Sequence, residues 1–365
     1  MRHSSMSHMY LNLFNESIAG LVGLPNVGKS TLFNALLSKQ IADAANYPFC
    51  TIDPNVGVVE VPDDRLPKLA EVVQSQKLVP AAIEFVDIAG LVKGAHKGEG
   101  LGNQFLAHIR EVDTIVMVIR DFESENIVRA GSVNPVDDVQ TLLTELQLAD
   151  LQTIEKQQPP RPNAEKEEKV RWDVTLKIKS QLESGQCVDI MTFSDEQLQE
   201  VKSLNLLTIK PIIIVLNTDE NELNKSVTDV LNYPTFRISA KLEADMAGLN
   251  RMERLELLQA YGISEPGLDQ LIKITYATLG LITFLTAGEK EVRAWPIHKG
   301  TKAPQAAGTI HTDFEKAFIK AQISNYDDFV NLGGWKNLKE TGKVRFEGKE
   351  YVMQENDVVE FMVNT

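Results

Sequence analysis

The segment from Gly23 to Ser30 constrains this chain more than any other, because it fits G-x-x-x-x-G-K-[ST], the pattern of a phosphate-binding loop. An apolar stretch at 17–22 precedes it, and a stretch at 31–37 with leucines at helical spacing follows it. The motif requires this order of strand, loop and helix. The pattern therefore predicts a nucleotide-binding α/β domain rather than a glycine-rich turn that happens to contain Lys-Ser.

The expected roles of the loop residues follow from the chemistry of phosphate. Gly28 lets the backbone turn so that successive N–H groups and the next helix N-terminus point at phosphate oxygens. Lys29 is expected to place a positive charge on the terminal phosphates, and Ser30 to offer a hydroxyl ligand to Mg²⁺. The residues predicted to bind nucleotide in this segment are Asn26, Val27, Gly28, Lys29, Ser30 and Thr31.

Two later segments are predicted to complete a magnesium and γ-phosphate site. Thr51 lies in a proline-marked loop, where switch proteins supply a threonine to Mg²⁺, and Asp87 ends an apolar strand at 81–86. Gly90 can present its N–H to the terminal phosphate. Leu91 stands where many related GTPases have a glutamine that orients the attacking water, so slow intrinsic hydrolysis is predicted. Lys29, Gly90 and Leu91 are the predicted catalytic positions.

Continuous apolar runs predict the remainder of a doubly wound, mostly parallel sheet that is covered on both faces. These runs lie at 114–119 and 211–216, and the second run ends at Asn217 and Glu220. Ser239 follows the next predicted strand. Ligands of such sheets bind at the carboxyl ends of strands, so Asn217, Glu220 and Ser239 are predicted to lie beside the base.

Changes in composition divide the chain into parts. Residues 137–205 are rich in Leu, Gln, Glu and Lys, which indicates an inserted helical domain, and Pro159, Pro160 and Pro162 interrupt it. Residues 281–365 change to short strands and glycine-rich turns, as in a small α+β module. The predicted parts are a loose N-terminal extension at 1–15, a nucleotide-binding domain at 16–136 and 206–280, the helical insertion at 137–205, and the module at 281–365.

Composition also excludes several classes of protein. The net charge of −14 argues against non-specific nucleic-acid binding, although lysines of the C-terminal module leave room for a local basic patch. The two cysteines form neither a disulfide framework nor a metal spacing, so a cytoplasmic location is predicted. No run reaches the roughly 20 apolar residues that span a bilayer, and the N-terminal residues do not fit a secretory signal. No membrane partner is therefore expected.

Four ordered segments resemble one known family. They are GLPNVGKSTLFNAL at 23–36, NYPFCTIDPN at 46–55, FVDIAGLVKGAHKGEGLGNQFL at 85–106 and AAGTIHTDFEKAFIKAQ at 306–322. Together they resemble the Obg-like ATPase (YchF) family, and the resemblance runs from about residue 17 to the C-terminus. It implies a P-loop NTPase domain, an inserted coiled-coil domain and a C-terminal TGS domain with a β-grasp fold. It also implies association with ribosomes and a link to translation and stress responses.

Two positions allow the residues of this chain to be compared with those of its relatives. Family members commonly carry a histidine shortly after the strand that follows the glycine-rich switch, and Arg129 occupies that position here. In potassium-stimulated relatives, an asparagine at the position of Asn26 helps to bind a monovalent cation beside the phosphates. Stimulation by K⁺ is therefore a further prediction, beside the requirement for Mg²⁺.

The base preference is predicted from the segment that begins at Asn217. Guanine-specific relatives have N-K-x-D here, and the aspartate accepts from two N–H groups of guanine. Thr218 takes the lysine position, and Glu220 takes the aspartate position with an extra methylene that moves the carboxylate by about a bond length. ATP is therefore predicted over GTP, and the N-x-x-E pattern of the family agrees. Dual specificity stays open, because the sequence SAK at 239–241 resembles a guanine-side loop.

Two classes of function follow from these observations. The leading hypothesis is a slow, Mg²⁺-dependent ATPase that regulates translation or a stress response on the ribosome or a ribosomal subunit. The alternatives are a GTP-using or dual-specificity Obg-type GTPase, and a nucleotide-gated ribosome- or RNA-binding module in which hydrolysis is incidental. The helical insertion and the TGS-like module are predicted to face the ribosome, because neither is needed to hold nucleotide.

Overall fold

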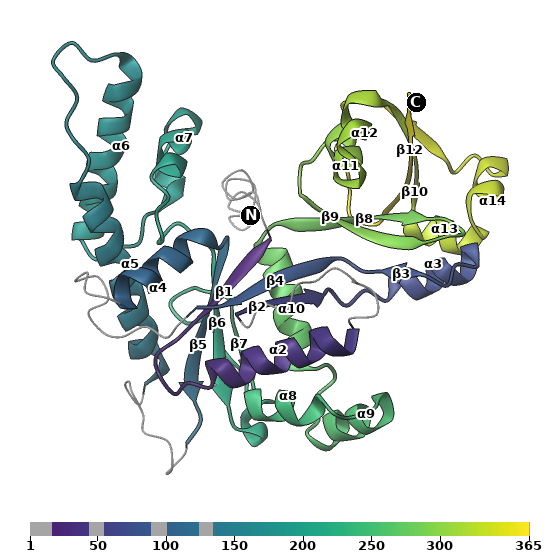
Figure 1. The fold of residues 1–365 in the computed structure, drawn as a ribbon, viewed down its shortest axis with the longest axis horizontal. Coiled ribbons are helices and arrows are strands. Elements are labelled where there is room, and N and C mark those ends of the chain that lie inside the picture. The colour runs from purple at the N-terminus through teal and green to yellow at the C-terminus, as the bar shows by residue number, and fades with distance from the viewer. Residues whose placement is uncertain (1–16, 44–54, 89–100, 124–133, 365) are drawn as a thin grey trace. The chain divides into compact units, whose positions relative to one another are not determined.

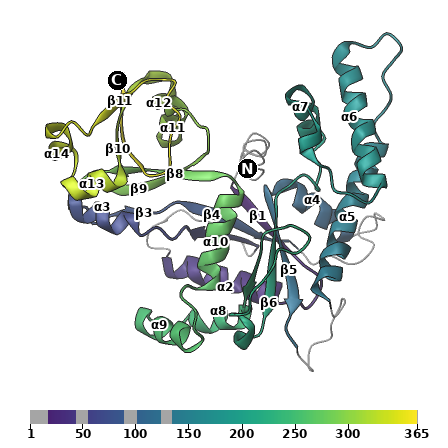
Figure 2. The same cartoon turned by 180° about the vertical axis from the view of Figure 1, so that it is seen from behind.

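The chain is divided between two compact units. The computed structural model describes residues 17–43, 55–88, 101–123 and 134–364. The first unit comprises residues 1–39, 52–57 and 84–270, and the second comprises 40–51, 58–83 and 271–365. Figure 1 shows the elements of both units, and Figure 2 shows them from behind.

The first sheet carries the predicted parallel arrangement. Its six strands have the order β2-β4-β1-β5-β6-β7. The pairings of β1 with β4 and β5, of β5 with β6 and of β6 with β7 are all parallel. This confirms the mostly parallel sheet. The strands are β1 (Ile18–Val22), β2 (Val56–Glu60), β4 (Ala82–Asp87), β5 (Thr114–Asp121), β6 (Ile212–Thr218) and β7 (Thr235–Ile238).

Helices cover the central strands of this sheet. β6 is buried along its whole length and β5 is buried up to Arg120, as expected for strands with a helix layer on each face. Both views place α4 and α5 on one side of the sheet and α2 and α8 on the other (Figures 1 and 2). The helices of the sheet region are α2 (Lys29–Asp43), α4 (Leu101–Glu111), α8 (Ala240–Met246), α9 (Arg251–Ala260) and α10 (Gly267–Thr278).

The predicted insertion is helical. It contains α5 (Pro135–Glu155), α6 (Lys166–Glu183), the short η3 (Ile190–Thr192) and α7 (Asp195–Ser203). The proline-rich stretch separates α5 from α6, so the two helices form a packed pair rather than one long helix. The core of the insertion is apolar and also takes in α7 and the residues after it; it includes Ile154, Val174, Ile178, Leu182, Val201 and Leu206.

A buried carboxylate fastens this insertion where it rejoins the sheet. Asp150 of α5 accepts hydrogen bonds from the backbone N–H groups of Leu207 and Thr208, each at 2.8 Å, and from Thr208 Oγ1 at 2.7 Å. Three donors satisfy a group that would be costly to bury alone. The chain therefore enters β6 at a fixed position relative to α5.

The second unit has the β-grasp arrangement. Its sheet has the order β11-β10-β12-β8-β9-β3, with β12 parallel to β8 and the β8–β9 and β10–β12 pairs antiparallel. Helix α11 (Ala303–Ile310) packs its alanines against Phe284, Ile323 and Val359 of the sheet. This confirms the predicted C-terminal α+β fold. The strands are β3 (Leu78–Val79), β8 (Leu281–Ala287), β9 (Val292–His298), β10 (Phe318–Asn325), β11 (Arg345–Glu347) and β12 (Asp357–Val363).

One part of the second unit comes from the N-terminal half of the chain. β3 and α3 (Arg65–Val73) belong to residues 58–83, and β3 pairs with β9 in parallel. Val292 N also donates to Lys77 O at 2.9 Å. The predicted nucleotide-binding domain at 16–136 contains this segment, whereas in the structure it packs in the second unit. Composition could not reveal this, because the partner strand lies more than 200 residues later.

The remaining helices of the second unit are short. They are α12 (Thr312–Ala317), α13 (Tyr326–Leu332) and α14 (Trp335–Glu340). Across the described residues, no helix combines the length and the apolar composition that crossing a membrane requires.

Candidate nucleotide-binding site

The phosphate-binding loop joins β1 to α2, and its backbone needs glycine at two positions. Gly28 has a φ of 88°, and a Cβ there would overlap the side-chain amide of Asn217. A Cβ at Gly23 would lie 2.7 Å from Val118 O of β5. Leu32 N donates to Gly28 O at 3.0 Å, so the first turn of α2 begins directly at the loop. The N–H groups of that turn are therefore at the place where the motif predicts that phosphate binds.

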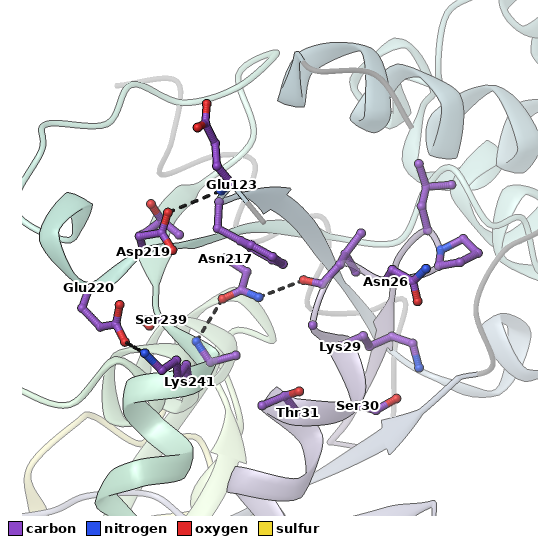
Figure 3. Close-up of a pocket in the computed structure, with 17 residues that line it drawn as sticks. Asn26, Lys29, Ser30, Thr31, Glu123, Asn217, Asp219, Glu220, Ser239 and Lys241 are labelled. Carbon is purple, nitrogen blue, oxygen red and sulfur yellow. Dashed lines mark hydrogen bonds and ion pairs between the residues drawn. The ribbon is translucent and has the colours of Figure 1, made fainter. Parts of the chain in front are cut away.

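A cavity of about 840 Å³ opens at the carboxyl ends of the strands. All residues predicted to bind nucleotide line it, from the loop segment Asn26 to Thr31 and from Asn217, Glu220 and Ser239 on the opposite side (Figure 3). The sheet therefore brings together residues that lie almost 200 positions apart in the chain. Binding of nucleotide to them stays a prediction.

Asn217 connects the two sides of the cavity. Its Nδ2 donates to Val27 O at 2.8 Å, and its Oδ1 accepts from Ala240 N at 2.9 Å. Only 5% of the residue is exposed. Figure 3 shows the amide between the phosphate-binding loop and the start of α8. Asn217 thus holds the loop on which the phosphates would rest.

Ser239 also stabilises the base side, as the N-cap of α8. Its hydroxyl accepts from Leu242 N at 3.3 Å and caps α8, and the residue is buried. Such a cap stabilises a helix by roughly 1 kcal/mol. The side chain therefore positions the loop at 239–241, whose backbone borders the cavity.

Lys29 and Asp87 form an ion pair at the phosphate side. The side chains are 9% and 17% exposed, so the charges face each other in a partly desolvated place. Both residues, with Ser30, also line a second cavity of about 670 Å³ beside the first. Lys29 would have to exchange its carboxylate partner for phosphate oxygens when nucleotide binds.

The chemistry of the donors fits Mg²⁺. This ion prefers oxygen ligands and is usually held by one or two carboxylates or hydroxyls together with substrate phosphates and water. The Ser30 hydroxyl and the Asp87 carboxylate face one cavity, so they provide such donors. Within the described ranges, no group of three or more His, Cys, Asp or Glu residues forms a metal site of another kind.

Several predicted residues lie outside the described parts of the chain. They are Thr51, predicted to bind Mg²⁺, the predicted catalytic positions Gly90 and Leu91, and Arg129.

Two residues and one ion pair on the base side of the cavity were not predicted from the sequence. Phe122 and Glu123 follow β5, and the Arg120 guanidinium stacks on the Phe122 ring at 4.5 Å. Lys241 of α8 pairs with Glu220 at 2.8 Å. The rule that ligands bind at carboxyl ends of strands could have indicated Phe122, since it directly follows a predicted strand. The pairing of Lys241 had no signal in the sequence.

The three residues that follow Asn217 all interact with other parts of the protein. Thr218, at the lysine position of N-K-x-D, is buried, and its Oγ1 accepts from Arg237 Nη1 at 3.4 Å. Asp219 Oδ2 accepts from Glu123 N at 3.4 Å. Glu220 begins the short helix η4 (Glu220–Glu222) and is held by Lys241. Each of the three side chains has a protein partner (Figure 3 shows those of Asp219 and Glu220).

Comparisons with known proteins agree with this architecture. A family model named YchF-GTPase_C, described as a protein of unknown function (DUF933), matches residues 281–364. A second model, described as a 50S ribosome-binding GTPase, matches residues 18–157.

Whole-chain relatives extend the match. The Ribosome-binding ATPase YchF of Bacillus subtilis is 50% identical over 362 residues, which cover 95% of this chain and 99% of the relative. The protein of the same name from Haemophilus influenzae is 48% identical and covers 94% of this chain and 98% of the relative. The solved structure of the Schizosaccharomyces pombe YchF GTPase has a TM-score of 0.84 at 35% identity and covers 96% of this chain and 98% of that chain. Identity at this level over nearly the full length of both sequences means that the chain belongs to the YchF family.

Proposed function

We propose that this chain is a Mg²⁺-dependent ATPase that binds the ribosome and regulates translation or a stress response in the cytoplasm. The observation that carries the proposal is the cavity at the carboxyl ends of β1, β5 and β6, with a phosphate-binding loop on one side and a base-side loop on the other. The name of its relatives, Ribosome-binding ATPase YchF, supports both the reaction and the partner.

Different residues of the site have different proposed roles toward the triphosphate. The loop N–H groups and Lys29 hold the phosphate oxygens and stabilise the charge that develops during hydrolysis. Ser30, Asp87 and, by prediction, Thr51 would hold Mg²⁺, which would neutralise negative charge on the phosphates. Gly90 is proposed to donate its N–H to the γ-phosphate. Since the leucine at position 91 cannot orient water, the intrinsic rate is expected to be slow.

The proposed preference for ATP rests on the base side. Guanine is read by a carboxylate that accepts from its N1–H and its exocyclic amine, and losing such a pair leaves buried polar groups unsatisfied. Glu220 is longer than the aspartate of N-K-x-D and already has a partner, and Thr218 lacks the stem that would cover the base. A purine is still accommodated, whereas guanine gains no selective contact.

Titration with both nucleotides in Mg²⁺ tests this preference. We expect ATP to bind more tightly than GTP, and the double variant Thr218→Lys with Glu220→Asp to shift the ratio toward GTP. GTP binding tenfold tighter than ATP, a gap of about 1.4 kcal/mol, would overturn the ATP preference and favour the GTPase alternative. An unchanged ratio in the double variant would show that the base is read elsewhere.

Phosphate release measured with and without ribosomes tests the enzyme. We expect slow turnover that ribosomes change. Nucleotide binding without detectable phosphate release in either condition would instead favour a nucleotide-gated binding module with incidental hydrolysis.

A further inference from the structure

An ion pair borders the base side of the cavity. Glu220 belongs to η4 after β6 and Lys241 to α8 after β7, and Lys241 Nζ lies 2.8 Å from Glu220 Oε1. The glutamate side chain is 16% exposed and that of the lysine 76%. Both residues line the cavity, and Figure 3 shows the pair as a link between the two base-side loops. The lysine thus reaches from the solvent side to a carboxylate in the cavity wall.

The Glu220 carboxylate already has two donors. The Lys241 ammonium donates to it, and so does the backbone N–H of Glu220 itself, and both interactions lower the pKa of this carboxyl. Any N–H group of a base must therefore compete with an ammonium for the same oxygens. A guanine offers two N–H donors on this edge, whereas adenine offers one amine beside the N1 acceptor, which a carboxylate repels.

We propose that Lys241 is a specificity-determining residue that acts through Glu220. Its ammonium holds the carboxylate in a position where the carboxylate does not accept from guanine, and this favours adenine nucleotides. Lys241 is a positioning residue, because the effect requires no contact with the base. The inference rests on the proposed binding of nucleotide at this site. It concerns how much Lys241 changes the ratio of GTP to ATP affinity, and not which nucleotide the unsubstituted chain prefers.

The first test compares three lysine variants of the full-length chain. In Lys241→Ala, the carboxylate is released, so we expect the ratio Kd(GTP)/Kd(ATP) to fall about two- to fivefold, the range that an exposed ion pair is worth. Lys241→Arg keeps the pair and should keep the ratio of the unsubstituted chain. Lys225→Ala is the matched control, because Lys225 pairs with Glu222 of the same short helix but does not line this cavity. Its ratio should not change.

The second test places Lys241→Ala in a Glu220→Gln background. Because the lysine acts through the carboxylate, we expect no further change of the ratio there. If Lys241→Ala shifts the ratio equally with Glu220 present and in the Glu220→Gln background, the inference is overturned. It is also overturned if Lys241→Ala weakens ATP and GTP binding in parallel and leaves the ratio unchanged, because that result indicates that Lys241 contacts the nucleotide directly. A preference for GTP in the unsubstituted chain would overturn the proposed ATP specificity alone, because the effect of Lys241 would still be measurable.

Discussion

Single side chains in this protein hold whole loops in place. Asn217 is the clearest example, since one buried amide bonds to both the phosphate-binding loop and the start of α8. Each such hydrogen bond contributes about 1 kcal/mol, and an unsatisfied partner costs more. The position of the phosphate-binding loop therefore depends on Asn217 at the base side, whose amide bonds to the backbone carbonyl of Val27.

Replacing Gly28 with alanine should therefore disturb nucleotide binding strongly. The φ of 88° disfavours any Cβ, and the Asn217 amide occupies the space that the methyl group needs. We expect ATP affinity to fall at least tenfold in titration calorimetry, about 1.4 kcal/mol. Gly185→Ala is the matched control, because Gly185 has a φ of 76° and its new methyl group would meet no atom within 4 Å. Similar losses of ATP affinity in both variants would contradict this account.

Asn26 carries the prediction about K⁺. It lies in the phosphate-binding loop with a φ of 64° and lines the cavity. We expect phosphate release to be faster in K⁺ than in Na⁺ at equal ionic strength, and Asn26→Ala to remove the difference. Asn34→Ala, on the exposed side of α2, should retain it. Equal rates in the two salts for the unsubstituted chain would count against a monovalent cation site.

Between elements, a buried glutamate of the first unit joins α8 to the first residue of α10. Glu243 of α8 is 6% exposed, and its Oε1 accepts at 2.7 Å from the N–H of Gly267, the first residue of α10. Burial raises the pKa of Glu243 to about 7. The helix junction is therefore held by a carboxyl that the fold prefers to keep protonated.

This junction predicts how stability depends on pH. A carboxyl whose folded pKa lies above its unfolded value stabilises the fold at low pH, and that stability declines as pH rises from about 4.5 to about 7. Glu243→Gln keeps an acceptor without the charge. Relative to the unsubstituted chain, we expect it to gain about 1 to 3 kcal/mol in urea unfolding at pH 8 and little at pH 4.5. The exposed substitution Glu256→Gln should give no such difference between the two pH values. An equal gain at both pH values would show that burial of the charge is not the cause.

Elements with strong local signals were predicted from sequence, and elements defined by distant partners were not. The loop from Gly23 to Ser30 has its strand and its helix next to it, and the continuous apolar runs within β5 and β6 indicate a covered sheet. The two-residue strand β3 has no pattern of its own and exists only because β9 pairs with it. Likewise, the partner of Glu220 lies in the first turn of α8, and spacing along the chain cannot show which lysine reaches this glutamate.

At the scale of the whole molecule, the proposed ribosome contact needs a test that leaves both units folded. Deleting 281–365 would remove the strand with which β3 pairs, so substitution of exposed lysines is cleaner. Lysines and arginines of the C-terminal module are the candidates for this contact. Lys302 pairs with Glu350, and Arg293 lies near Glu291. Lys316, at the end of α12, and Lys320, near the start of β10 and over the Phe346 ring, are exposed.

We expect Lys316→Glu with Lys320→Glu to reduce co-sedimentation with ribosomes severalfold at low salt, because contacts with RNA phosphates depend on positive charge. ATP affinity should not change. Lys225→Glu, which reverses the charge of one exposed lysine in the first unit, is the control. Undiminished co-sedimentation of the double variant would refute the assignment of this surface.

The origin of β3 and α3 also has a consequence for biosynthesis. Lys77 and Glu291, which form an ion pair beside the β3–β9 pairing, are separated by 214 residues along the chain. At about 5–20 residues per second, translation takes roughly 10 to 40 s to cover that distance. During this interval Leu66 and Leu69 of α3, which are buried in the finished protein, have emerged without the strands of the second unit. These two leucines therefore lack their packing partners from the second unit until the last quarter of the chain has been made.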